Sequence, residues 1–353
     1  IVLCLNRNSL WSSELSIWED AVKKAPRMYR TQSNWGKALQ MAGREEEALA
    51  AYRRAISIDD RHADAYNNIA TLYHLRGEVD QAIDWYLRAL ERHANMEEIH
   101  QNLGDAYAQK GNLDSALAAY RRALDIDPQK GDIWSNYGLT LYGAGDLPAA
   151  EAALRRAIEL LPNQAEPYNN LANIHADRDQ YRQAEVLYRQ ALEYEPEDRG
   201  QILANLGDLY RSMGRFDVGR QQLEEAIALR PSVADWHYRL GRLEREAGRR
   251  EVAQEAFSAA LKLAPDHARA RVQHAELLSE GGVWQPAIAA FRRALAEKAD
   301  YSRAWYGLGR ALEMVGDGAA ALQAYRQFLV GWQGAASRTR EVHARIEALE
   351  GDS

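Results

Sequence analysis

Cysteine and long apolar runs are nearly absent from this chain, and each absence excludes a class of protein. The single cysteine, Cys4, can form neither an internal disulfide nor a cysteine cage around a metal. No run approaches the ~20 apolar residues that a membrane-spanning helix requires. The basic excess typical of nucleic-acid-binding proteins is missing too, because 44 Lys and Arg face 51 Asp and Glu and leave a net charge of −7. We therefore expect no nucleic-acid partner.

Motifs for catalysis, cofactor binding and metal binding are lacking as well. There is no glycine-rich phosphate loop, and no serine or cysteine nucleophile has a nearby base. Two histidine pairs, His93 with His100 and His267 with His274, are seven residues apart, which is wider than the usual spacing of metal ligands. We predict that the chain is not an enzyme and holds neither a cofactor nor a metal.

What the sequence does contain is an internal repeat, which residues 96–128 show most clearly. Apolar residues at helical spacing predict a first helix over Glu97–Gln109 and a second helix with Asp114 as its N-cap. Gly111 is expected to end the first helix in the left-handed conformation, and Pro128 ends the second because proline cannot continue a helix. Such a pair has two apolar faces and must stack on a neighbour.

The small residue of the first helix, Gly104, recurs along the chain at a constant spacing. Successive counterparts are 34 residues apart, with a single step of 35. They are Gly36, Ala70, Gly138, Ala172, Gly207, Gly241, Ala275 and Gly309. The turn glycine keeps the same register and is replaced once, by Asp179, a residue type that tolerates the left-handed region better than most.

This period and these markers resemble the tetratricopeptide repeat (TPR) family over nine full repeats. The resemblance implies an all-α fold: a right-handed TPR superhelical solenoid of nine helix-turn-helix repeats with an N-terminal half-repeat and a C-terminal capping helix. We expect the half-repeat and a membrane-proximal segment in residues 1–28, the repeats in 29–335, and the capping helix and tail in 336–353. Phe328 stands where other repeats carry alanine, which predicts wider packing in the last repeat.

One position of the first helix is a candidate for peptide binding, because it is expected to face the concave groove of the solenoid. Six consecutive repeats carry asparagine there: Asn34, Asn68, Asn102, Asn136, Asn170 and Asn205. An asparagine amide both donates and accepts hydrogen bonds, so it can pair with any peptide backbone. The ladder is similar to the one lining the groove of O-GlcNAc transferase repeats, which grips extended peptides. In the alternative interpretation, these asparagines only bond a neighbouring helix.

Later repeats carry arginines that form a candidate anion-binding cluster. Its members are Arg239, Arg242, Arg245, Arg303 and Arg310. The planar fork of arginine pairs with carboxylates at two points, so an acidic stretch of a partner would lie here. The alternative is a solvated charged face, because Glu244, Glu246 and Glu276 are close enough in sequence to neutralise the arginines.

The residues before the repeats suggest a second resemblance. Leu10–Ala25 matches the second helix of a repeat. Ile1–Leu5 is a short apolar run, either a terminus packed on the first helix or the end of a membrane span. The residues that follow resemble the junction of membrane-embedded sugar transferases that carry TPR tails, and those that match are Arg7, Asn8, Trp11, Glu14, Trp18, Glu19, Asp20, Ala21, Val22 and Pro26. That resemblance implies a membrane tether upstream of Ile1, with the repeats on the extracytoplasmic side. The sequence by itself leaves the localisation open between this side and the cytoplasm. Because the chain begins at Ile1, we expect it to be a piece of a longer protein.

Two functions follow from these patterns. The first is a non-catalytic scaffold that binds an extended peptide or partner segment in its concave groove. The second is the extracytoplasmic accessory domain of a membrane-embedded glycosyltransferase-like protein, which presents acceptor to a catalytic part missing from this chain. Both imply a protein or peptide partner.

Overall fold

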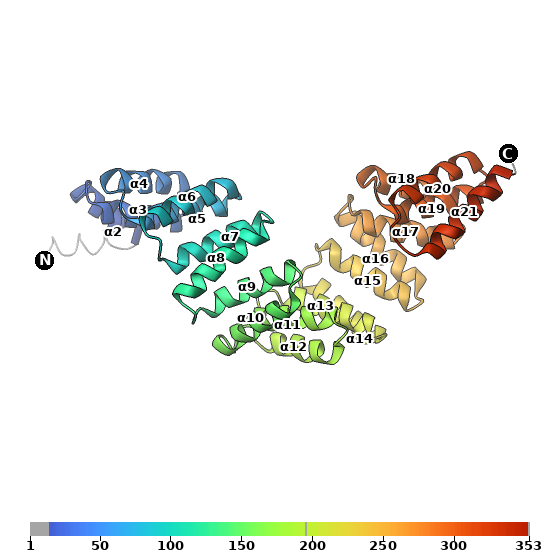
Figure 1. Cartoon of the computed structure of the whole chain (residues 1–353), viewed down its shortest axis with the longest axis horizontal. Helices are drawn as coiled ribbons and strands as arrows, with labels where there is room; N and C mark the ends of the chain where they lie inside the picture. The colour runs from blue at the N-terminus through green and yellow to red at the C-terminus, as the bar shows by residue number, and fades with distance from the viewer. Residues whose placement is uncertain (1–13, 195, 352–353) are drawn as a thin grey trace. The chain divides into compact units, whose positions relative to one another are not determined.

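The computed structural model describes residues 14–194 and 196–351, and within these ranges it is helical without any strand. Figure 1 labels the helices. They are α2 Glu14–Lys24, α3 Tyr29–Met41, α4 Glu45–Ile58, α5 Ala63–Leu75, α6 Val79–Arg92, α7 Glu97–Gln109, α8 Leu113–Ile126, α9 Gly131–Gly143, α10 Leu147–Leu160, α11 Ala165–Asp177, α12 Tyr181–Glu193, α13 Arg199–Ser212, α14 Phe216–Leu229, α15 Ala234–Glu246, α16 Arg250–Leu263, α17 Ala268–Glu280, α18 Trp284–Glu297, α19 Ser302–Met314, α20 Gly318–Gly331 and α21 Ala336–Gly351. This confirms the all-α fold of paired helices.

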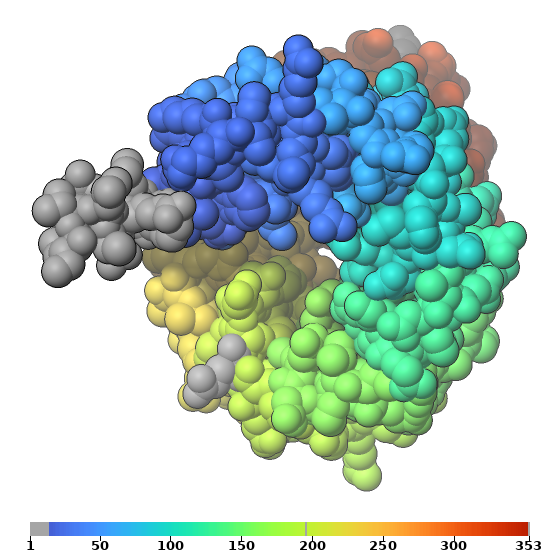
Figure 2. Space-filling model, turned by 90° about the vertical axis from the view of Figure 1, so that its left-hand side faces the viewer, coloured from blue at the N-terminus to red at the C-terminus, as the bar shows by residue number. Residues whose placement is uncertain are grey.

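The chain divides into two compact units, residues 1–174 and 175–353. Within each unit, the two helices of a repeat pack on each other and each repeat packs on the next. In the N-terminal unit, the space-filling view in Figure 2 shows successive repeats as adjoining bands of atoms that follow a curve from blue through cyan to green. The C-terminal unit is likewise built of helix pairs, from α13 with α14 to α19 with α20.

The turn between α7 and α8 shows how the sequence ends one helix and starts the next. Gly111 has φ 78°, the left-handed conformation predicted for it, and Asp179 has φ 56° at the corresponding turn. The predicted N-cap at Asp114 is wrong. Asn112 caps α8 instead, and its side-chain oxygen accepts the backbone N–H of Ser115 at 3.2 Å. Asp114 lies in the first helical turn, where its charge faces the positive end of the helix dipole.

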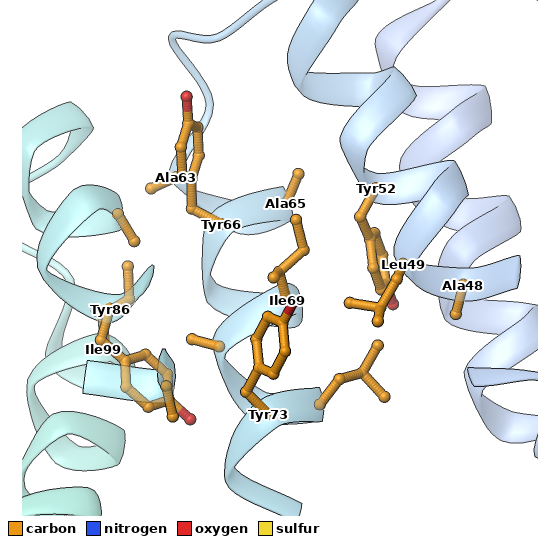
Figure 3. Close-up of a cluster of buried hydrophobic side chains, with 14 of the residues drawn as sticks. Ala48, Leu49, Tyr52, Ala63, Ala65, Tyr66, Ile69, Tyr73, Tyr86 and Ile99 are labelled. Carbon is orange, nitrogen blue, oxygen red and sulfur yellow. The ribbon is translucent and has the colours of Figure 1, made fainter. Parts of the chain in front are cut away.

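The core is made of aromatic rings packed against small residues. Figure 3 shows Tyr52, Leu49 and Ile69 gathered between α4 and α5, with Tyr86 on the other side of α5. Tyr52 is completely buried, and its ring lies where a side chain at Gly36 would otherwise stand. Burying a large side chain of this kind contributes about 1.5–3 kcal/mol, so the small–large pairing stabilises each repeat that has it.

Both ends of the described chain carry an extra helix. α2 packs on α3 without fully burying any residue, as expected for the second helix of a half-repeat. α21 lies against α20 and buries Val342 and Ile346, so a capping helix follows the last repeat as predicted. The predictions for Ile1–Leu5 and for residues 10–13 concern positions outside the described residues. None of the helices in the described part of the chain is both long and apolar enough to cross a lipid bilayer.

Candidate functional site

The asparagine position lies on the first helix of each repeat. Asn34, Asn68, Asn102, Asn136 and Asn170 belong to α3, α5, α7, α9 and α11 of the N-terminal unit, and Asn205 belongs to α13 of the C-terminal unit. Their side chains are half-buried except that of Asn170, which is buried. The position is therefore the same in every repeat, but its hydrogen bonds differ from one repeat to another.

Two of the asparagines donate hydrogen bonds to the preceding repeat. The Nδ2 of Asn102 donates to the Oδ1 of Asn67 at 3.2 Å, which joins α7 to α5. The Nδ2 of Asn136 donates to the Oδ1 of Asp105 at 3.0 Å, which joins α9 to α7. These bonds brace adjacent first helices, the role named in the alternative interpretation.

The first two asparagines of the series are free of such bonds. Asn34 and Asn68 make no hydrogen bond to any residue in the described ranges. Farther along, the Oδ1 of Asn170 accepts from Asn169 at 3.4 Å, while its own Nδ2 is buried without a partner among the described residues. In α13, the Oδ1 of Asn205 accepts from Arg239 at 3.1 Å. The free amides thus lie at the start of the series.

Asp105 sits beside the asparagine position in a half-buried network. Its Oδ1 accepts the hydroxyl of Tyr120 at 2.6 Å as well as the Asn136 amide. Burial raises the pKa of the Asp105 carboxyl above its ordinary range, and the hydrogen bonds from Tyr120 and Asn136 offset this in part. The carboxylate therefore acts here as a shared acceptor between repeats.

Three of the five candidate arginines are already neutralised. Arg239 pairs with Asp235 at 2.6 Å and Asp208 at 3.2 Å. Arg245 and Arg303 share the carboxylate of Glu276, and that bond raises the pKa of Arg303. Glu276 therefore does pair with the cluster as the alternative interpretation expected. The other two glutamates named there pair elsewhere, Glu244 with Arg220 and Glu246 with Arg211.

The remaining two arginines have different surroundings. The guanidinium of Arg242 lies 5.9 Å from the ring centre of Tyr238, a cation–π distance. Arg310 is exposed on α19 and forms no hydrogen bond or ion pair within the part of the chain that the structure describes. The structure thus brings Arg245, Arg303 and Arg310 to one place and leaves Arg239 and Arg242 outside it.

That place is a cavity of about 600 Å³ among the last helices of the C-terminal unit. It is lined by Arg245, Glu276, Ser279, Glu280, Trp284, Phe291, Arg303, Tyr306, Gly307, Arg310, Met314, Phe328, Trp332 and Arg338. Its volume falls in the range of roughly 300–1,000 Å³ that is typical of ligand sites. The lining combines aromatic side chains with arginines, so it can receive an apolar group and an anion together.

Two departures from the repeat pattern are among the residues that line the cavity. Gly307 occupies the asparagine position of the last repeat, and any side chain there would collide with the ring of Phe291. Phe328 replaces the usual alanine, is buried, and stacks on Trp332 with 5.0 Å between ring centres. Sequence analysis noted Phe328 as a widening of the last repeat but missed the cavity. The signal that could have found it is a glycine and a phenylalanine that break the pattern within one repeat.

Tyr306 joins this cavity to the capping helix. Its hydroxyl donates to Glu341 at 2.6 Å and accepts from Arg338 at 2.8 Å. Burial, followed by the bond to Glu341, raises the pKa of Tyr306, so it is a neutral hydrogen-bonding group at physiological pH.

Among the described residues, His, Cys, Asp and Glu form no group of three or more that could hold a metal ion.

Solved structures show the same fold at low sequence identity. An APC/C hetero-tetramer, Cut9-Hcn1, is 19% identical with a TM-score of 0.60 and covers 83% of this chain and 58% of that chain. A tetratricopeptide repeat protein from Parabacteroides merdae is 18% identical with a TM-score of 0.59, covering 70% of this chain and 98% of its own. A human IFIT1 dimer with m7Gppp-AAAA is also 18% identical at 0.59, with shares of 94% and 84%. At these identities the similarity shows the fold alone.

Curated relatives match over a shorter stretch. Protein O-mannosyl-transferase TMTC1 of Homo sapiens and of Mus musculus is 34% identical over 68 residues, or 19% of this chain. The matched stretch spans 8% of the human protein and 7% of the mouse protein. The similarity therefore concerns about two repeats and not the whole of those proteins.

Family models cover nearly all of the described chain. Residues 14–244 match the model of the Cilia and flagella-associated protein 70 C-terminal domain. Residues 234–267 and 272–336 match tetratricopeptide repeat models. Since the first match alone exceeds half of the sequence, the chain belongs to the tetratricopeptide repeat family, in the group described by the C-terminal domain of cilia and flagella-associated protein 70.

Proposed function

We propose that this chain is a non-catalytic scaffold that binds an extended segment of a partner protein along the first helices of its repeats. A helical repeat scaffold of this type fits protein–protein interaction, and the tetratricopeptide fold is typically non-catalytic. The observation that carries the finer proposal is the pair of half-buried amides of Asn34 and Asn68, which lack partners in the described ranges.

The physical basis is the two-sided chemistry of the amide. A free asparagine side chain can donate to a peptide carbonyl and accept from a peptide N–H, so it reads backbone and not side chains. Asn102 and Asn136 donate to neighbouring repeats and therefore have less to offer a ligand. Each hydrogen bond to the peptide contributes about 0.5–1.5 kcal/mol net. Asn34 and Asn68 together should therefore raise the affinity for an extended peptide by a measurable amount.

The test uses a displayed library of random peptides selected on the folded chain. Changing both Asn34 and Asn68 to alanine should weaken the selected peptides about tenfold, the equivalent of two such bonds. The melting temperature should stay the same, because no bond within the described protein is lost. Asn95→Ala with Asn163→Ala is the matched control, since both residues lie in loops between helices.

Two results would contradict the proposal. One is that no peptide is enriched on the wild-type chain. The other is that enriched peptides bind the Asn34/Asn68 double variant and the loop control equally well. In the second case binding occurs elsewhere on the molecule, and the asparagines are not part of it.

The alternative function, an accessory domain of a glycosyltransferase-like protein, has less support. The similarity to the O-mannosyl-transferases covers 19% of this chain and leaves most of those proteins unmatched. The sequence of the full-length gene upstream of Ile1 distinguishes the two functions. A series of hydrophobic spans there would favour the accessory domain.

A further inference from the structure

We propose that the cavity lined by residues of α15 and α17 to α20, by Trp332 and by Arg338 of α21 binds a bulky apolar side chain next to a carboxylate, as presented by an acidic segment of a partner protein. The inference rests on the proposed function, because it specifies the chemistry of one part of the bound segment. It concerns a site in the C-terminal unit, whereas the free asparagines belong to α3 and α5 of the N-terminal unit.

The apolar half of the site is formed by aromatic rings and one methionine. Phe328 is nearly completely buried and stacks on Trp332. The two rings form one aromatic side of the cavity. Trp284 and Phe291 line the cavity, and Met314 is 58% exposed at its edge. Covering an exposed methionine and aromatic edges with an apolar side chain removes them from water, which drives binding.

The polar half carries an excess of positive charge. Four arginines and two glutamates line the cavity, which leaves an excess of two positive charges. Glu276 and Glu280 are engaged by Arg245, and Glu276 also by Arg303. Because Glu341 pairs with Arg338, the charge that an anion could complement is that of Arg310.

Arg310 is the group that would meet this anion. Arg338, another arginine of the cavity, donates to the hydroxyl of Tyr306 at 2.8 Å and pairs with Glu341 at 3.0 Å. Arg310 has no such bond among the described residues. Its planar guanidinium can pair with a carboxylate at two points.

The experiment uses short acetylated and amidated peptides as probes. The test peptide joins tryptophan to aspartate, and two matched peptides replace either the tryptophan with alanine or the aspartate with asparagine. Binding is measured by nuclear magnetic resonance titration of the whole chain. We expect the tryptophan–aspartate peptide to bind, and each replacement to weaken binding about tenfold, because it removes either the apolar contact or one charge-assisted pair.

Variants of the protein locate the site. Arg310→Gln should weaken the tryptophan–aspartate peptide about tenfold and remove its preference over the asparagine peptide. Arg340→Gln is the matched control, because Arg340 is exposed on α21 and does not line the cavity. Raising the salt from about 0.1 M to 1 M should weaken binding to the wild type much more than to Arg310→Gln. Circular dichroism confirms that both variants are folded.

Each outcome decides the inference. Equal binding to Arg310→Gln and Arg340→Gln, or no binding of the test peptide, would overturn it. So would tighter binding of adenosine monophosphate, because a nucleotide also joins a flat ring to an anion. The short probes cannot span successive repeats, so the Asn34/Asn68 double variant should bind them normally. If the short peptides do not bind while library peptides still bind through Asn34 and Asn68, the inference about the cavity is refuted and the proposed scaffold function is not.

Discussion

Asp105 shows how one residue links the repeats through its chemistry. Its carboxylate accepts hydrogen bonds from Tyr120 of its own repeat and from Asn136 of the next. Desolvation raises its pKa above the ordinary value of 3.8, and it also raises the pKa of Tyr120. The hydrogen bonds between the two repeats therefore depend on the Asp105 carboxyl, whose ionisation is disfavoured by burial in the folded protein.

We expect this cost to appear as a pH dependence of stability. Because the folded-state pKa of Asp105 is raised, its favourable contribution to the free energy of unfolding is complete below 3.8 and is lost as the pH rises through the raised pKa. Asp105→Asn keeps an acceptor but does not titrate. The stability of the wild type relative to this variant should therefore fall as the pH rises above the ordinary aspartate pKa of 3.8. Urea unfolding of both proteins measures it, and a constant difference would show that Asp105 is not penalised.

At the scale of elements, two glycines of one repeat have different roles. Gly111 ends α7 with φ 78°, and an added Cβ would meet nothing within 4 Å. Gly104 is helical, and an added Cβ would lie 2.6 Å from Cε1 of Tyr120. The first glycine is needed for its backbone conformation, and the second for the space that it leaves to the ring.

Alanine substitutions should separate these roles. Gly111→Ala should lower the free energy of unfolding by about 1–2 kcal/mol, the cost of a left-handed L-residue, and leave the packing unchanged. Gly104→Ala should cost about 1–3 kcal/mol through overpacking and displace Tyr120 from Asp105. The near-ultraviolet circular dichroism of tyrosine distinguishes them, since only Gly104→Ala should alter it. An altered spectrum in Gly111→Ala would show that the turn also controls the packing.

At the scale of the whole molecule, the core is a series of neighbouring clusters. In the C-terminal unit, one cluster joins Leu223 to Trp236, another joins Tyr238 to Phe257, and a third joins Phe291 to Phe328. Stability in such an array is approximately the sum of each repeat and its interfaces with its neighbours. Helices with a single neighbour should therefore open first.

Hydrogen exchange followed by mass spectrometry can test this order. α2 buries no residue completely and α21 buries only Val342 and Ile346, so amides of both helices should exchange well before those of α7. α7 packs on both α6 and α8 and provides the internal reference. Simultaneous exchange of all three helices would mean that the array unfolds as one cooperative unit.

The sequence by itself determined the features that depend on neighbours along the chain. The 34-residue period and the small and large residues predicted the helix pairs, and Glu97–Gln109 is the helix observed as α7. The left-handed conformation of Gly111 and Asp179 was also predictable, because steric hindrance within a few residues decides it. The predicted N-cap at Asp114 was wrong, although capping also depends on near neighbours in the sequence. Asn112, immediately after the glycine, takes that role.

Only the tertiary structure decided what each candidate side chain does. Arg303 meets Glu276, which is 27 residues away, and Asn102 meets Asn67, which is 35 residues away. Identical residues at one repeat position therefore differ: Asn102 braces a helix while Asn68 is free, and Arg242 lies over the Tyr238 ring while Arg310 has no partner among the described residues. The physical reason is that hydrogen bonds and ion pairs depend on the side chain that the adjoining repeat presents, and a residue's own sequence neighbours do not specify it.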